Sequence, residues 1–318
     1  MTVSGPVKPL ELGTTLIHEH ILVDFIGADS IGYERWDRKD VIDKILPYLA
    51  EIKERGVKTF IDCAPVYLGR DPFLLKELSA RSGLHIITNT GYYGAGNNKF
   101  LPENFFSSDV SEIAGKWIDE FKNGIEGSSV KPGFIKIAVN EVNTLSADHK
   151  KIISSAAITH LETGLTIVSH TGTDIPAFEQ LDILKNTGVD PSAFVWTHAQ
   201  SGTIEGNIKA ASMGAWISLD NILNREDLEP GTPYSIQWYA DRIIALKNKG
   251  FLNKVLISHD SGWYDPAKPQ GGTINGYTDI FDYFLPVLLE KGLTRQDIDS
   301  LLINNPQEAF LIKVRSLR

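Results

Sequence analysis

Eight short runs rich in Val, Ile and Phe recur along the 318-residue chain, and longer segments with helical periodicity separate them. The expected strands are 15–23, 58–64, 84–91, 133–139, 166–170, 193–198, 216–219 and 255–259. The clearest helical stretches are 39–55, 72–82, 109–121, 147–163 and 175–187. Strands that alternate with helices pair in parallel through right-handed crossovers, and eight such units close naturally into a barrel. We therefore predict an α/β fold that is a single (β/α)8 TIM barrel.

The ends of the helices and the absence of linkers support this organisation. Several expected helices end at a glycine, the residue that best tolerates a left-handed conformation: Gly56, Gly83, Gly164, Gly188 and Gly250. An open doubly wound sheet is the main alternative, but neither a G-x-G-x-x-G turn after an early strand nor a G-x-x-x-x-G-K-[ST] loop is present. We expect residues 1–318 to form one domain, with long loops at 221–234 and 261–276.

Composition narrows the class of protein. No run of 18 apolar residues occurs, so we expect no membrane span, and the polar start of the chain does not resemble a signal peptide. The net charge of −9 argues against nucleic acid or an anionic membrane as a partner. A single cysteine, Cys63, excludes an intrachain disulfide and fits a reducing, cytoplasmic location.

The strongest local signal is Leu16-Ile17-His18-Glu19-His20, at the end of the first expected strand. Side chains two apart on a strand share a face, so His18 and His20 project together whereas Glu19 points the other way. Two imidazoles at the mouth of a barrel can chelate a divalent metal. Alone, the pair is equally compatible with solvent-facing or core histidines.

Other metal-ligand side chains recur at strand ends. His170 and His198 end the strands at 166–170 and 193–198, and Asp260 follows the strand at 255–259. A barrel gathers the carboxyl ends of its strands around one axis, so these groups should converge. Four histidines and a carboxylate exceed the needs of one catalytic zinc and predict two divalent metals, zinc or else Co, Mn or Fe.

Lys136 stands in the middle of the apolar strand 133–139. A buried ammonium beside two divalent cations is strongly disfavoured. The residues alone leave three alternatives, which are a neutral amine, an outward orientation, or a chemical change that makes the side chain anionic.

The motifs LGTTLIHEH, FIKIAVNE, IVSHTGTD, VWTHAQ and ISHDSGW resemble, in order, those of the phosphotriesterase family of the amidohydrolase superfamily, which includes lactonases. The similarity runs from Gly5 to Pro306. It implies a binuclear centre in which His18, His20 and Asp260 hold the buried metal and His170 and His198 hold the exposed one. Lys136 falls where family members carry a carboxylated lysine that bridges both ions. The resemblance also implies a homodimer.

A hydrolytic mechanism follows from the resemblance. A hydroxide that bridges the metals would attack a carbonyl or phosphoryl centre, and Asp260 would accept its proton. Tyr93 matches a position where lactonases place a tyrosine near this hydroxide, although it is equally compatible with a packing role.

The loops are expected to set the substrate. Asn221 replaces the arginine that frequently follows Leu-Asp in the family, and Arg225 or Lys268 is an alternative source of positive charge. For each of these two residues, an exposed and solvated charge is the favoured alternative. Trp238 and Trp263 are candidates to line an apolar pocket, and they are equally compatible with a dimer interface. We expect a small-molecule lactone or carboxylic ester as substrate and an organophosphate triester as the second choice. A metal-binding barrel without catalysis is a remoter alternative.

Overall fold

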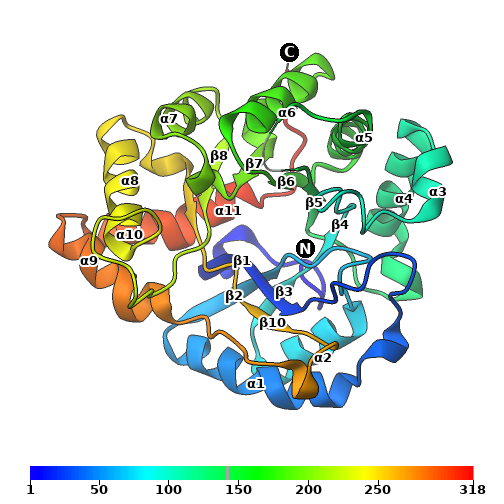
Figure 1. Cartoon of the computed structure of the whole chain (residues 1–318), viewed down its shortest axis with the longest axis horizontal. Helices are drawn as coiled ribbons and strands as arrows, with labels where there is room; N and C mark the ends of the chain where they lie inside the picture. Colours follow the sequence, from blue (N-terminus) through cyan, green and yellow to red (C-terminus); the bar gives the residue numbers. More distant parts are fainter. Residues whose placement is uncertain (141–142, 318) are drawn as a thin grey trace.

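The computed structural model describes residues 1–140 and 143–317, and its strands stand in a ring with the helices outside (Figure 1). The strands are β1 (Thr14–Leu22), β2 (Val57–Asp62), β3 (His85–Ile87), β4 (Asn89–Thr90), β5 (Phe134–Ala138), β6 (Thr166–His170), β7 (Phe194–Thr197), β8 (Trp216–Leu219), β9 (Val255–Ile257) and β10 (Gly262–Tyr264). The helices are α1 (Arg38–Glu54), α2 (Pro72–Ser82), α3 (Glu103–Ser107), α4 (Val110–Asn123), α5 (Ala147–Thr163), α6 (Asp174–Asn186), α7 (Ile204–Ser212), α8 (Ile236–Asn248), α9 (Leu285–Glu290), α10 (Arg295–Asp299) and α11 (Asn305–Ala309).

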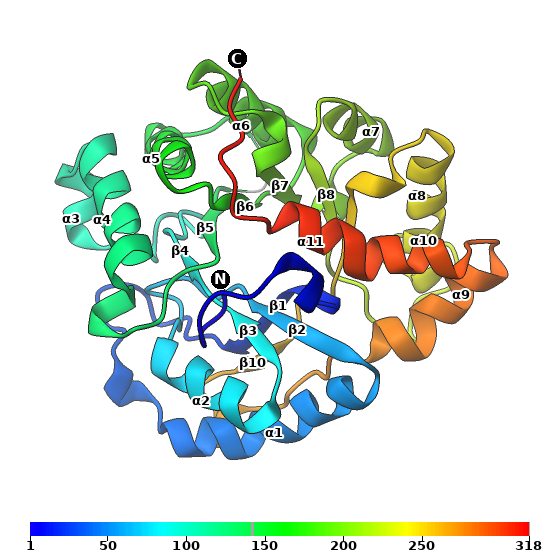
Figure 2. The ribbon, with the colours of Figure 1, turned by 180° about the vertical axis from the view of Figure 1, so that it is seen from behind.

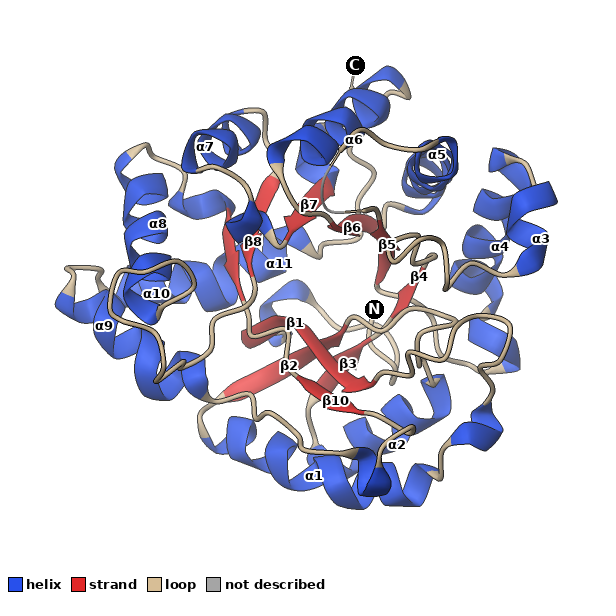
Figure 3. Cartoon of the chain, viewed as in Figure 1, coloured by secondary structure: helices blue, strands red, loops and turns tan. Residues whose placement is uncertain are grey.

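The strands pair in parallel in two sheets, with the orders β10-β1-β2-β3 and β4-β5-β6-β7-β8-β9. Only Thr88 separates β3 from β4 along the chain, so these two strands together form the strand predicted at 84–91. At the other seam, the Asp260 N–H donates to the His18 carbonyl oxygen (3.0 Å), and the His18 N–H donates to Ser258 Oγ (3.0 Å). The predicted (β/α)8 barrel is confirmed, and the view coloured by secondary structure shows its strands inside the helices (Figure 3).

The helices begin and end close to where the sequence predicts. Side-chain oxygens of Asp37, Asp71, Asp109 and Ser146 accept backbone N–H bonds at the starts of α1, α2, α4 and α5. The five predicted glycines all have positive φ, between 72° at Gly83 and 90° at Gly188. Among the described residues, no helix combines the length and apolar character that crossing a bilayer requires.

Two apolar layers hold the barrel together. The larger layer packs the helices against the outside of the strands. The smaller one fills the barrel with inward-facing side chains such as Phe134 and Val168, and includes Cys63. Leu12 and Phe310 join this inner layer, and the view from behind shows α11 and the N-terminal segment covering that end of the barrel (Figure 2). The opposite, carboxyl ends of the strands are therefore left to carry the polar side chains.

Candidate metal centre

The six predicted ligands lie on the strands of the barrel or shortly after them. His18 and His20 are on β1, Lys136 is on β5, and His170 is the last residue of β6. Lys136 and His170 stand two residues beyond Phe134 and Val168 of the inner apolar layer, so strand alternation directs them into the barrel as well. The remaining two, His198 and Asp260, follow β7 and β9.

His198 and Asp260 share an unusual backbone conformation. Their φ values are 60° and 53°, in the left-handed region that residues other than glycine seldom occupy. Such strain persists only where the surrounding contacts fix it, and it concentrates at functional sites. Here it occurs directly after β7 at His198 and three residues after the end of β9 at Asp260.

One group of atoms converges on Asp260. His20 Nε2 lies 3.0 Å from Asp260 Oδ1, and His18 Nε2 lies 3.5 Å from the same oxygen. Lys136 Nζ is 3.3 Å from His18 Nε2. These side chains come from β1, β5 and the turn after β9, and all but Asp260 are buried. Three ligand atoms of His18, His20 and Asp260 are close enough to share one cation.

A second group adjoins the first. His198 Nε2 lies 2.7 Å from His170 Nδ1, and the Tyr93 hydroxyl lies 3.2 Å from the same His170 atom. The rings of His18 and His198 are 5.2 Å apart, and His198 Nδ1 is 3.9 Å from Asp260 Oδ2. Asp260 therefore reaches both groups.

Asp220 contacts one histidine of each group, and it was not among the site residues predicted from the sequence. This fully buried carboxylate accepts from His18 Nδ1 (3.0 Å) through Oδ2 and from His198 Nδ1 (2.7 Å) through Oδ1. Ser218 Oγ also donates to it (2.7 Å). With both Nδ1 atoms bound to Asp220, the Nε2 atoms of His18 and His198 face the other candidate ligands, which is the usual arrangement around metal-binding histidines. The available signal was its position directly after β8.

Burial and charge set the protonation of these groups. Burial, followed by the Lys136 ammonium, lowers the pKa of His18 to about 3, so its ring is neutral and able to bind a metal. Burial alone would raise the pKa of Asp220, but His198 and His18 outweigh it and hold this pKa well below its usual range.

Glu19 and His259 lie on the other side of β1, as strand alternation predicts. Glu19 Oε1 accepts from His259 Nδ1 (2.7 Å) and from Ser258 Oγ (2.7 Å), and Glu19 Oε2 accepts from the Ser261 N–H (3.1 Å). Both Glu19 and His259 are fully buried. This network fixes the turn that carries Asp260 against β1.

Two glycines allow neighbouring backbone to approach the strands that carry these residues. A Cβ atom at Gly91, where φ is 123°, would lie 2.0 Å from the Lys136 carbonyl oxygen. One at Gly262, where φ is 103°, would lie 2.1 Å from the His20 carbonyl oxygen. Any side chain at either position would displace a candidate ligand.

An arc of aromatic rings runs along the mouth from one group to the other. Ring centroids are 5.9 Å apart between His20 and Trp263, 6.0 Å between Trp263 and Phe25, 6.5 Å between Phe25 and Phe100, 5.6 Å between Phe100 and Tyr93, and 5.2 Å between Tyr93 and His170. Phe25 and Trp263 are 45% and 38% exposed. The arc offers an apolar wall beside the polar cluster.

The other residues predicted to contact the substrate do not belong to the aromatic arc. Trp238, on α8, packs against Tyr234 and Tyr239 and lies outside the arc. Asn221 follows Asp220 in the chain, and its Oδ1 accepts a hydrogen bond from Arg225 Nη2 (2.9 Å). This bond anchors the Arg225 side chain. Lys268 is exposed and lies 3.5 Å from the Asp265 carboxylate.

The donor set fits divalent cations. Imidazoles, a carboxylate and a lysine from distant strands meet inside an apolar barrel, a combination that stable packing alone does not require. His20 Nδ1 is also buried without a hydrogen-bond partner within residues 1–140 and 143–317. The two sets of ligand atoms suit cations that prefer nitrogen and oxygen donors.

Comparisons with known proteins agree with this geometry. The sequence model of the phosphotriesterase family matches residues 1–310. The chain is 28% identical to the phosphotriesterase homology protein of Escherichia coli, covering 94% of this chain and 98% of that protein. It is 28% identical to an aryldialkylphosphatase of Saccharolobus solfataricus (96% of each) and 26% identical to the N-acetyltaurine hydrolase of Rattus norvegicus (98% and 97%).

A solved structure is similar over nearly the whole chain. The crystal structure of the Escherichia coli phosphotriesterase homology protein, with phosphate in its active site, superposes with a TM-score of 0.79 at 26% identity. The match covers 94% of this chain and 99% of that one.

Proposed function

This chain belongs to the phosphotriesterase family, and from that premise we propose that it hydrolyses lactones or carboxylic esters with the help of two divalent cations. The observation that carries the proposal is the convergence of four histidines, Lys136 and Asp260 at one end of the barrel. Relatives named aryldialkylphosphatase and N-acetyltaurine hydrolase support the reaction class.

We assign one cation to His18, His20 and Asp260 and the other to His170 and His198, with Lys136 between them. Zinc suits this mixture of nitrogen and oxygen donors, as do Co, Mn and Fe. Carboxylation of Lys136 would replace a buried ammonium by an anionic ligand, which removes the cost of placing an ammonium beside two divalent cations.

When bound, two such cations lower the pKa of a water molecule and polarise the oxygen of the substrate. The protein supplies the proton acceptor. Burial alone would raise the pKa of Asp260, but His18 and His20 outweigh it and hold this pKa well below its usual range. The carboxylate is therefore ionised, and at 19% side-chain exposure it can pass a proton towards the mouth.

Tyr93 and the aromatic arc position the substrate. The Tyr93 hydroxyl, beside His170, is placed to donate to an oxygen of the substrate. Phe25, Phe100 and Trp263 provide a wall for an apolar acyl or aryl group. Arg225 is the better candidate for a polar substituent, because Asn221 anchors it whereas Lys268 is paired at the surface.

A phosphotriester is the second candidate, because the aryldialkylphosphatase relative is among the most similar proteins and the same wall fits an aryl leaving group. An amide is a further class, suggested by the name of the N-acetyltaurine hydrolases.

The test is turnover of a matched panel by protein stripped of metal and then reloaded with Zn, Co or Mn. The panel contains a long-chain acyl lactone, an aryl carboxylic ester, a dialkyl aryl phosphotriester and an N-acyl amide. We expect two equivalents of metal and the highest kcat/KM for the lactone or the ester. Two bound metals without turnover of any member would indicate a binding protein, and full activity after stripping would refute the metal requirement.

A further inference from the structure

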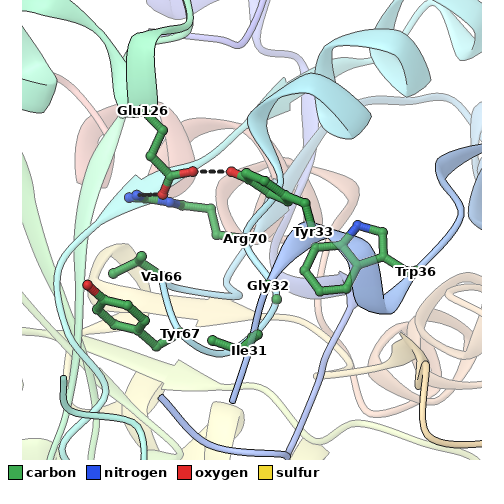
Figure 4. A pocket seen from close by; sticks show the side chains of 9 residues that line it. Ile31, Gly32, Tyr33, Trp36, Val66, Tyr67, Arg70 and Glu126 are labelled. Atoms are coloured by element: carbon green, nitrogen blue, oxygen red, sulfur yellow. Dashed lines mark hydrogen bonds and ion pairs between the residues drawn. The ribbon is translucent and has the colours of Figure 1, made fainter. Parts of the chain in front are cut away.

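A cavity lies apart from the candidate metal centre, and none of the six candidate ligands lines it. It encloses about 130 Å³ between the segment after β1, the turn after β2 and the segment after α4. Figure 4 shows Tyr33 and Trp36 on one side, Tyr67 and Val66 on the other, and Glu126 with Arg70 between them. At about 30 Å³ for each water molecule, the space suits a group of a few heavy atoms.

The cavity is rich in aromatic rings. The rings of Tyr33 and Trp36 are 5.7 Å apart at an interplanar angle of 86°, and the Tyr67 ring lies across the space from them. Aromatic faces attract cations through their negative quadrupole, and sets of such rings bind ammonium groups. The Arg38 guanidinium already makes such a contact, because its Cζ lies 5.0 Å from the centre of the Tyr33 ring.

The charges around the cavity leave a negative surplus. Arg70 donates to Glu120 (2.7 Å) and to Glu126 (2.8 Å), so two carboxylates face one guanidinium whose side chain is fully buried. Arg38 is paired with Asp71 (2.6 Å) and does not offset the surplus. Tyr33 donates its hydroxyl hydrogen to the other oxygen of Glu126. The two guanidinium groups of Arg38 and Arg70 therefore face three carboxylates, those of Asp71, Glu120 and Glu126. An anionic ligand would meet net repulsion.

We propose that this cavity is a second binding site, which takes a compact alkylammonium ion. The aromatic rings of Tyr33, Trp36 and Tyr67 contact its methyl or methylene groups, and Glu126, which is 32% exposed, balances its charge. A neutral compound of the same shape lacks both the cation–π attraction and the pairing with the carboxylate, so the site discriminates by charge.

The turn after β2 places this cavity next to the mouth of the barrel. Tyr67 has a positive φ of 68° and lines the cavity, whereas the adjacent Leu68 packs with Val23 and Phe100 beside the candidate metal centre. The turn after β2 therefore contributes one side chain to the cavity and the next one to the mouth of the barrel.

The experiment is calorimetric titration of the metal-loaded protein with choline and with 3,3-dimethylbutan-1-ol, its uncharged counterpart. We expect saturable binding of choline at one site and binding of the alcohol that is at least about tenfold weaker. Glu126→Gln should weaken choline binding about tenfold, and Tyr67→Leu about fivefold, while Glu290→Gln, an exposed carboxylate on α9, serves as the matched control.

Three results would overturn the proposal. They are absence of saturable choline binding, equal binding of choline and the alcohol, and loss of choline binding in Trp263→Leu with full retention in Glu126→Gln and Tyr67→Leu. The last result would place the ion at the aromatic arc of the mouth. Because Tyr67→Leu keeps the Arg70 pairs intact, it tests the site even if Glu126→Gln folds poorly.

Discussion

Replacing Asp220 by Asn tests whether one buried carboxylate organises both halves of the centre. The substitution preserves size and removes one acceptor. Asp220 accepts from His18 Nδ1 at 3.0 Å and from His198 Nδ1 at 2.7 Å, one ring through each oxygen. An asparagine has a single acceptor oxygen, so its NH2 group must face one of the two rings. That ring then has to carry its proton on Nε2, where it blocks metal binding.

The expected loss follows from these two contacts. A hydrogen bond to a charged group contributes about 1.5–3 kcal/mol, and one of the two is lost. Partners of this kind behind metal-binding histidines typically change metal affinity or activity by about 10–100-fold. We expect a decrease in this range for the cation that loses its histidine, and a similar decrease in kcat/KM.

The assay is metal content after dialysis against a graded chelator, measured together with kcat/KM on the best substrate of the panel. Asp62→Asn is the matched control, because Asp62 is equally buried, accepts a backbone N–H from Ile21 and contacts neither ring. Unchanged metal retention and unchanged kcat/KM in Asp220→Asn would refute the positioning role. Equal losses in both variants would show a general effect of the substitution on the barrel.

Three further predictions concern single residues. Asp260→Asn should lower kcat by about 10²–10⁴-fold with a smaller change in KM, since the amide cannot accept the proton; steady-state kinetics at full metal occupancy would expose an unaffected kcat. Burial raises the pKa of Asp62 from 3.8 to about 6, so the native state holds this proton more tightly than the unfolded state does, and the resulting stability, present below about pH 4, is lost as the pH rises to about 6. Denaturant titrations should therefore show the unfolding free energy of the unmodified protein falling by about 2–2.5 kcal/mol between pH 4 and 7 relative to Asp62→Asn, and parallel pH profiles would contradict this. Gly91→Ala should destabilise the fold by about 3 kcal/mol or more, because its Cβ meets the Lys136 carbonyl oxygen, whereas Gly56→Ala, with open space around it, should cost only about 1–2 kcal/mol; equal thermal midpoints would disprove the argument.

Much of the architecture follows from local sequence patterns. The strands at 166–170 and 216–219 and the helices at 72–82 and 147–163 match their predicted bounds, because buried β-branched runs and capped helices are specified by neighbouring residues. β10 was not predicted. It lies in the long loop expected at 261–276, and it pairs with β1 because this loop folds back beside that strand. Such pairing depends on the closed barrel and leaves little local periodicity.

The candidate site was predictable where it obeys strand geometry. His18, His20, Lys136 and His170 converge because alternation and the barrel axis determine where they point. Asp220 was not predicted because its role depends on lying between the rings of His18 on β1 and His198 after β7, and the spacing of residues along the chain does not reveal this contact. The positions of Phe25 and Phe100 in the aromatic arc depend in the same way on how the loops fold back over the mouth.

The seam between β1 and the turn after β9 has a consequence for how the chain assembles. Glu19 accepts hydrogen bonds from His259, which lies 240 positions later in the sequence, and its two neighbours in the chain, His18 and His20, are candidate ligands. At a synthesis rate of about 5–20 residues per second, the first strand waits roughly 12–50 s on the ribosome before its partners exist. For most of that interval His18 and His20 lack Asp220 and Asp260, the carboxylates that contact them in the folded protein. The barrel and the candidate metal centre are thus completed together, late in the synthesis of the chain.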